Sequence, residues 1–381
     1  MTHESHAMTD YAPLPASFVP LDMLDPAWEA RGHGRRLAAA LEGAAALRTR
    51  LTAETPVLSV RTLPLTTLLY PTRFALGGAA LSPAPYVSLT HRCLLVRFRQ
   101  GEATRTLLFN PTDILRARTT PYFARMIERF GERLSSLAAQ SFAPLEAQLA
   151  RLGLGAGDID YLAFDHFHTQ DLRGLLGTVD GRLAPRFPNA TLLAPRAEWE
   201  QWDDLHPMQR AWFVAEGRAG VETGRVCLTD GDLLLGEGVA LVRTPGHTVG
   251  NQTLFLKTDR GVWGCSENGT CADNWSARHS RIAGVANAAR QGDLDVILNS
   301  NTPEYGADQY TSMMIERTVV DPVAHNPEFV QMFSSSEVTP TAIAPGLSPS
   351  YEHRRIEHGP LPAAPPAPPP ATTHSPGGAP P

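Results

Sequence analysis

Apolar segments of strand length recur along this chain, and several of them end in a cluster of polar residues. This recurrence constrains the fold more than any other feature, because in α/β proteins polar side chains at strand ends commonly assemble into sites. The four clearest segments are residues 160–164, 239–243, 262–265 and 295–298. We therefore expect a site built from the turns that follow these strands.

The rest of the pattern is also that of an α/β protein. Residues 57–69, 86–99 and 104–110 are predicted to be strands. Apolar residues at helical spacing predict one helix over 122–137 and a second, shorter helix over 145–152 that ends at a glycine pair.

Composition excludes several classes of protein. The chain has 381 residues, of which 43% are hydrophobic, enough for a sizeable core, and its net charge of −6 argues against a nucleic-acid-binding protein. No signal peptide is evident, and no uninterrupted apolar run reaches the roughly 18 residues of a membrane span. Four scattered cysteines are too few for a disulfide scaffold. We expect a cytoplasmic protein that acts on a small molecule and binds neither nucleic acid nor membrane.

The two ends of the chain differ from its middle. Residues 1–20 are predicted to be loose, and residues 21–358 to form a single domain with N- and C-terminal extensions. In residues 359–381, ten of 23 positions are proline, which predicts a disordered, partly extended tail. The extension over 321–349 is long enough to form a lid or the contact of a homodimer.

His166 and His168 directly follow the apolar segment 160–164. In extended backbone, residues two apart point to the same side, so the pair is a natural half of a transition-metal site. His247 stands in a tight turn between two predicted strands, where Pro245 and Gly246 restrict the backbone.

These segments resemble the metallo-β-lactamase superfamily over about residues 104–302. The Thr-Pro-Gly-His-Thr turn at 244–248 is similar to the family's TPGHT turn, and residues 158–168 resemble the strand that leads into its HxHxDH motif. Residues 187–190 and 195–199 resemble the strand and helix that follow. The resemblance implies an α/β fold of the αββα type, with two mixed β-sheets packed face to face and helices on the outer faces.

The chain also departs from the family pattern. Gln170 and Asp171 stand where the motif has Asp and His, the bridging aspartate is replaced around residues 265–267, and Asn301 corresponds to the last family histidine. The resemblance therefore implies a three-histidine metal site formed by His166, His168 and His247, without the ligands of a second metal.

Three neutral imidazoles with one open position form a competent catalytic zinc site. A metal bound there would lower the pKa of its water towards ~7 and polarise a carbonyl or phosphoryl oxygen. Asp171 is the predicted fourth ligand or general base, since a one-residue bulge would bring it to the position of the motif's aspartate. Glu267 is the second candidate for either role, while Asp165 and Asp113 are expected to hold imidazole N–H groups.

Three functional hypotheses follow. The first is a hydrolase that holds one transition metal, with zinc as the predicted metal and iron as the alternative, and acts on a small ester, lactone or thioester-like substrate. The second is a metal-free pseudoenzyme that binds a ligand or regulates a partner, in which Gln170 and Asn301 complete a polar network. The third is an iron-dependent oxidoreductase on the same fold, because three neutral ligands and one carboxylate can hold Fe(II).

Overall fold

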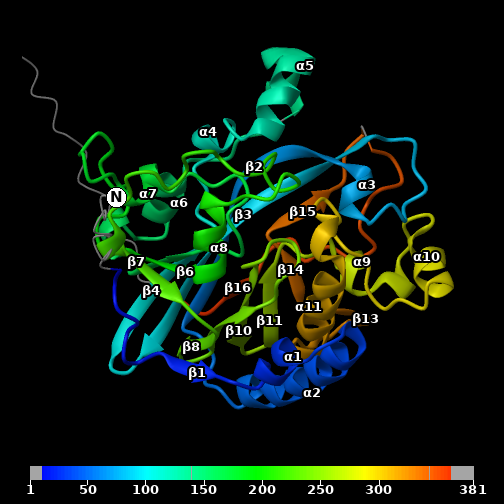
Figure 1. Ribbon diagram of the computed structural model, residues 1–381, viewed down its shortest axis with the longest axis horizontal. Helices are drawn as coiled ribbons and strands as arrows, with labels where there is room; N and C mark the ends of the chain where they lie inside the picture. The colour runs from blue at the N-terminus through cyan, green and yellow to red at the C-terminus, as the bar shows by residue number, and fades with distance from the viewer. Residues whose placement is uncertain (1–10, 139, 343, 362–381) are drawn as a thin grey trace, which may run out of the picture.

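The structure is a computed structural model, and it describes residues 11–138, 140–342 and 344–361. Most of the proline-rich tail predicted at 359–381 therefore lies outside the described residues, as does the first half of the N-terminal segment. Two β-sheets and the helices that cover them make up the molecule (Figure 1).

The first sheet has six strands, mostly antiparallel. In spatial order they are β1 (Val19–Leu21), β8 (Asp232–Gly236), β9 (Val239–Arg243), β10 (Gln252–Thr258), β11 (Gly261–Ser266) and β14 (Met332–Ser334). Only the pair of β11 and β14 is parallel among these described strands, so the sheet is mixed.

The second sheet is also mixed, because an antiparallel half joins a parallel half. Its order is β16 (Glu357–His358), β2 (Ser59–Pro71), β3 (Tyr86–Gln100), β4 (Ala103–Phe109), β5 (Tyr161–Ala163), β6 (Thr191–Pro195) and β7 (Val226–Thr229), with β15 (Ser336–Thr339) added to β3. A separate two-stranded sheet pairs β12 (Pro322–Val323) with β13 (Asn326–Val330).

Alternation along the strands produces three apolar layers. On β4, Leu107 and Phe109 face the other sheet, whereas Leu108 packs in the outer layer. On β10, Leu254 and Leu256 likewise face inward, and Phe255 packs against the helices on the outer side. Successive side chains of a strand point to opposite faces, so each sheet contributes one face to the central core and one to a helix layer. The αββα sandwich predicted from the resemblance is confirmed.

Helices α1 (Asp25–Glu29), α2 (His33–Thr52) and α11 (Gly306–Val319) cover the first sheet (Figure 1). The outer face of the second sheet packs against α6 (Leu145–Arg151), α7 (Arg173–Leu176) and α8 (Arg196–Glu200). The short helices α3 (Thr72–Ala75), α9 (Ala272–Trp275) and α10 (Val285–Gln291) lie at one side of the sandwich. After α4 (Ile114–Ala117), helix α5 (Pro121–Ala138) rises away from the body. No helix in the described ranges combines the length and apolar character that crossing a membrane requires.

Two predicted elements differ from the structure. The helix predicted over 122–137 is α5, but Gly131 breaks it with a φ of 79°. Residues 295–298 are not a strand. The Ile297 N–H instead donates to the carbonyl of Asn274 in α9 at 2.8 Å, and the strand position beside β11 is taken by β14.

The N-terminal segment and the extension at 321–349 are built into the domain to a larger extent than expected. From Tyr11 onward the chain packs on the sandwich: the Ala12 N–H donates to the Val226 carbonyl at 2.9 Å, Phe18 is buried, and β1 pairs with β8. Burial of Phe18 between the sheets opposes the looseness predicted for residues 1–20. The extension supplies β14 to the first sheet and β15 to the second, so this part of it is not a lid.

We expect Gly246→Ala to destabilise the protein by about 2–3 kcal/mol, the range of an overpacked core. Gly246 has a φ of 144°, and a Cβ there would lie 2.2 Å from the Gln309 Cα in α11. Gly34→Ala is the matched control, because nothing lies within 4 Å of a Cβ at that position in α2. Urea unfolding should show no loss for the control, since alanine suits a helix better than glycine. Equal stability of the two variants would contradict the close packing of the turn on α11.

Candidate metal centre

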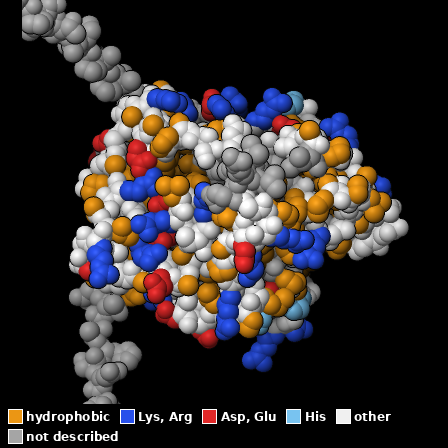
Figure 2. All heavy atoms as spheres, turned by 90° about the horizontal axis from the view of Figure 1, so that it is seen from above, with side chains coloured by type: hydrophobic (Ala, Val, Ile, Leu, Met, Phe, Trp, Pro, Cys, Tyr) orange, Lys and Arg blue, Asp and Glu red, His pale blue; other side chains and the backbone are white. Residues whose placement is uncertain are grey.

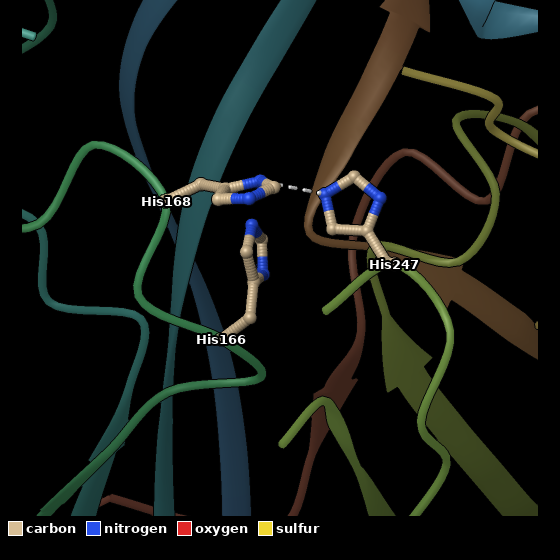
Figure 3. Close-up of side chains that lie close together, drawn as sticks. All are labelled: His166, His168 and His247. Atoms are coloured by element: carbon tan, nitrogen blue, oxygen red, sulfur yellow. Dashed lines mark hydrogen bonds between the residues drawn. The ribbon is translucent and has the colours of Figure 1, made fainter. Parts of the chain in front are cut away.

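His166, His168 and His247 converge at one edge of the sandwich (Figure 3). The first two lie in the loop after β5 of the second sheet, and His247 lies in the turn between β9 and β10 of the first. One ring nitrogen of each lies within 4.8 Å of the other two, and the His168 Nδ1 is 3.1 Å from the His247 Nε2. All three side chains are buried. The structure thus brings together the three histidines that the sequence singled out.

Hydrogen bonds define which nitrogens of two rings carry a proton. The His166 Nδ1 lies 2.7 Å from the Asp165 Oδ1, and the His168 Nε2 lies 2.6 Å from the Gln209 Oε1. Carboxylate and amide oxygens only accept, so both nitrogens donate and the opposite nitrogens keep their lone pairs. The Gln209 amide is oriented by Glu304, whose Oε1 accepts from the Gln209 Nε2 at 2.8 Å.

Burial favours the neutral form of two of the three rings. It lowers the pKa of His168 and of His247 well below the usual value, and the neighbouring imidazoles lower both further. Neutral imidazole is the form that binds a metal, and three such nitrogens suit zinc or iron. The donor set therefore fits one transition metal.

A buried carboxylate connects the two loops that carry the histidines. The Glu198 Oε1 on α8 accepts from the Phe167 N–H at 2.8 Å, between the first two histidines. Its Oε2 accepts from the Thr248 hydroxyl at 2.7 Å and from the Gly250 N–H at 3.1 Å. Burial raises the pKa of Glu198, while these donors and His166 oppose that rise. The sequence analysis missed this residue. No sequence signal singles out Glu198, because Arg196 and Glu200 stand beside it in the same polar segment.

Glu267 lies in the wall of the same cavity as the three histidines. Its Oε2 accepts from the Ser336 N–H at 2.8 Å, and burial, then the Asp165 carboxylate, hold its pKa well above the usual range. The cluster of ligand atoms in the described part of the chain consists of the three imidazoles and includes no carboxylate. Glu267 thus lines the cavity beside the three histidines but does not belong to the cluster of ligand atoms.

Asp171 does not lie where the sequence analysis expected it. Its carboxylate accepts from the Arg173 Nε at 3.0 Å and Nη2 at 2.6 Å, and Arg116 lies 3.7 Å away. The backbone turns at Thr169, which has a φ of 63°, and Gln170 lines the cavity in its place. Two guanidinium groups thus hold Asp171 away from the histidines, and the prediction of Asp171 as ligand or general base is corrected.

Of the two aspartates predicted to hold imidazole N–H groups, one bonds a histidine and the other caps a helix. Asp165 does so for His166, and its other oxygen accepts from the Asn110 amide at 3.1 Å and from the Ser335 hydroxyl. Asp113 instead caps α4, where its Oδ1 accepts from the Arg116 N–H at 3.2 Å.

Where the family pattern has second-metal ligands, this chain has a neutral polar network. The Gln170 Nε2 donates to the Thr112 hydroxyl at 3.0 Å, which bonds the His91 Nε2 at 2.8 Å. The His91 Nδ1 bonds the Ser336 hydroxyl at 2.9 Å, and burial lowers the pKa of His91 to about 4. His91 lines the cavity although no motif surrounds it in the sequence. Asn301 also lines it, and its Oδ1 is buried without a partner among the described residues.

The decisive feature is the position of the centre. Loops from two face-to-face mixed sheets, one with an HxH pair and one with a Pro-Gly-His turn, meet at a single edge of an αββα sandwich. The chain has the metallo-β-lactamase fold. No protein-family model matches the sequence, and no curated protein sequence matches it significantly.

Solved structures with weak likeness to the chain include a quorum-quenching N-acyl homoserine lactone lactonase, with 19% identity over 63% of this chain and 88% of that one, at a TM-score of 0.43. A probable metal-dependent hydrolase from Staphylococcus aureus has 14% identity over 58% and 78% of the two chains, also at 0.43. A hydrolase of the β-lactamase superfamily has 16% identity over 58% and 78%, at 0.36. Structural similarity at this level does not indicate which substrate this protein acts on.

We expect His247→Ala to abolish tight binding of a transition metal while the fold persists, because the core is large enough to hold without the metal, unlike that of a zinc finger. His279→Ala, at an exposed histidine, is the matched control. Titration of zinc into metal-free protein by calorimetry should show one site in the control and none in His247→Ala. Binding of equal affinity in both variants would mean that the three histidines do not share a metal.

Gln209→Leu should weaken zinc binding by roughly 10–100-fold without abolishing it, the usual effect of losing a partner that orients a ligand histidine. The same titration measures it. Gln291→Leu, at an exposed glutamine at the end of α10, is the control. An unchanged affinity in Gln209→Leu would show that the His168 ring is oriented without its amide partner.

Proposed function

We propose that the protein is a metal-dependent hydrolase that cleaves a small ester, lactone or thioester. One observation carries the proposal: three imidazoles, two of them with assigned lone pairs, converge on one point in the wall of a cavity of about 610 Å³. That volume lies in the range of small-molecule sites. Zinc is the metal that we propose, and when bound it would supply a water of lowered pKa and polarise the substrate carbonyl.

The roles of the protein residues follow from their contacts. Asp165 and Gln209 hold the rings of His166 and His168 in the orientation that presents one lone pair each. Hydrolysis adds the hydroxyl of water to the acyl carbon, breaks the acyl–oxygen or acyl–sulfur bond and leaves a proton for the leaving atom. Glu267 is suited to move that proton, because a carboxyl with a raised pKa holds a proton that it can donate.

The neutral network around Gln170 and His91 supports a single metal. Amides are poor zinc ligands, and Gln170 and Asn301 replace the aspartate and the last histidine of the family pattern. Elemental analysis of the purified protein should therefore find about one zinc per chain. Two metals per chain would contradict this part of the proposal, iron alone would favour the oxidoreductase hypothesis, and no transition metal would favour the pseudoenzyme.

We expect Glu267→Gln to retain the metal and to reduce turnover of an ester by ~10²–10⁴-fold, the contribution of a positioned acid or base. Glu128→Gln, at an exposed glutamate on α5, is the matched control and should hydrolyse at the parental rate. The measurement is kcat with an activated ester, alongside metal content. Full turnover in Glu267→Gln would exclude this residue from proton transfer.

A further inference from the structure

The cavity extends well beyond the three histidines, and its remaining walls are mostly apolar. They come from the β2–β3 hairpin, from α4 and from one side of α5. Representative side chains in these walls are Leu68, Leu89, Ile114, Phe123, Ile127 and Phe130. Several polar lining residues, Asp165, Gln170 and Glu267 among them, lie near the histidines, and Thr66, Thr67, Ser141 and Arg118 also contribute to the lining. The cavity therefore has one polar end and one apolar region.

The hydroxyls of the threonines in the apolar walls bond main-chain groups. The Thr66 hydroxyl donates to the Gln140 carbonyl at 3.1 Å, and the Thr67 hydroxyl accepts from the Gln140 N–H at 2.7 Å. Their polar atoms are thus occupied by main-chain groups. A ligand in this region gains mainly from burying apolar surface.

The cavity is long. His91 and Tyr86 both line it and are five residues apart on β3, which corresponds to about 17 Å of strand. At the far end, the Tyr86 ring packs edge-on against Phe130 with centroids 6.1 Å apart.

Helix α5 runs along this length. Near its start, Tyr122 stacks on Trp212 with centroids 4.6 Å apart, and the Trp212 ring centroid is 6.0 Å from that of His168. Eight residues later, about 12 Å along the helix, Phe130 meets Tyr86. The helix therefore forms a wall from the metal centre outward.

Seen from the side on which α5 rises, apolar side chains lie interspersed with arginines on the surface (Figure 2).

We propose that the apolar region binds a single unbranched acyl chain, so that the substrate is an acyl ester or thioester whose carbonyl lies at the histidines. The proposal rests on the proposed hydrolase function and adds its substrate class. A narrow ligand with one polar end matches a long cavity with one polar end. Each methylene buried there should tighten binding roughly four-fold.

Binding of fatty acids tests the site without hydrolysis. We would titrate dodecanoate, below its micellar concentration, and butyrate into the metal-free full chain by calorimetry. Dodecanoate has eight more methylenes, so it should bind at least ~100-fold more tightly, allowing for incomplete burial. Binding of dodecanoate that is no tighter than that of butyrate would overturn the proposal. So would tighter binding of 2-naphthoate than of dodecanoate, which would indicate a broad aromatic pocket.

A pair of tryptophan substitutions on α5 tests where the acyl chain binds. Ile127→Trp fills the cavity and should weaken dodecanoate binding at least ~10-fold, as expected for a site shortened by a few methylenes, with butyrate unaffected. Arg125→Trp adds the same side chain at an exposed position of the same helix and should leave both affinities unchanged. Equal effects of the two substitutions on dodecanoate affinity would overturn the placement of the acyl chain along α5.

Hydrolysis of para-nitrophenyl butyrate and dodecanoate separates this proposal from the one on which it rests. Chain-dependent fatty-acid binding with no hydrolysis of either ester would support the acyl-chain site and overturn the hydrolase function. Zinc-dependent hydrolysis with no preference for the longer chain in kcat/KM would support the hydrolase and overturn the acyl-chain site. The proposal expects zinc-dependent hydrolysis with a lower KM for dodecanoate.

Discussion

The geometry of the candidate centre depends on Glu198. Its carboxylate is fully buried and accepts three hydrogen bonds from the two histidine-bearing loops. A buried carboxylate without donors is very unfavourable, so the loops and the acid stabilise one another. The two loops come from different sheets, and this one side chain aligns them. The His168 Nδ1 and the His247 Nε2, one from each loop, lie 3.1 Å apart.

A second buried acid has a comparable role behind the His247 turn. Glu316 on α11 accepts from the Thr253 hydroxyl at 2.8 Å, from the Asn268 amide at 2.8 Å and from the Trp275 indole at 2.7 Å. Asn268 also accepts from the His247 N–H at 3.3 Å. Hydrogen bonds therefore link the turn to the helix layer as well as to the opposite loop, and rigid support of this kind is what a precisely placed ligand requires.

The substitutions around the centre act together. Gln170, Asn301 and His91 are neutral groups in the cavity wall, and hydrogen bonds connect Gln170 to His91 through Thr112. These hydrogen-bonded neutral groups leave no negative charge in this part of the wall that a second cation would have to balance.

The sequence alone determined the features that depend on short-range patterns. Alternation of apolar residues predicted β2, β3 and β4, and a spacing of two placed His166 and His168 on one side of a loop. The Pro-Gly-His turn could be identified because its backbone conformation is set locally. These features need only neighbours along the chain. The sandwich and the convergence of the three histidines were predicted from the family resemblance that these local motifs carry.

Only the tertiary structure decided the groups that surround the histidines. Asp171 is turned away by Arg173 and Arg116, whereas Gln209, 41 residues beyond His168, reaches its ring. Glu198 connects two sheets from a helix. Apart from the contact of Asp171 with Arg173, each of these contacts joins segments that are distant in sequence and have no local pattern in common. Residue spacing encodes which side of a strand a side chain occupies, but it cannot encode which distant donor or acceptor the folded chain brings to it.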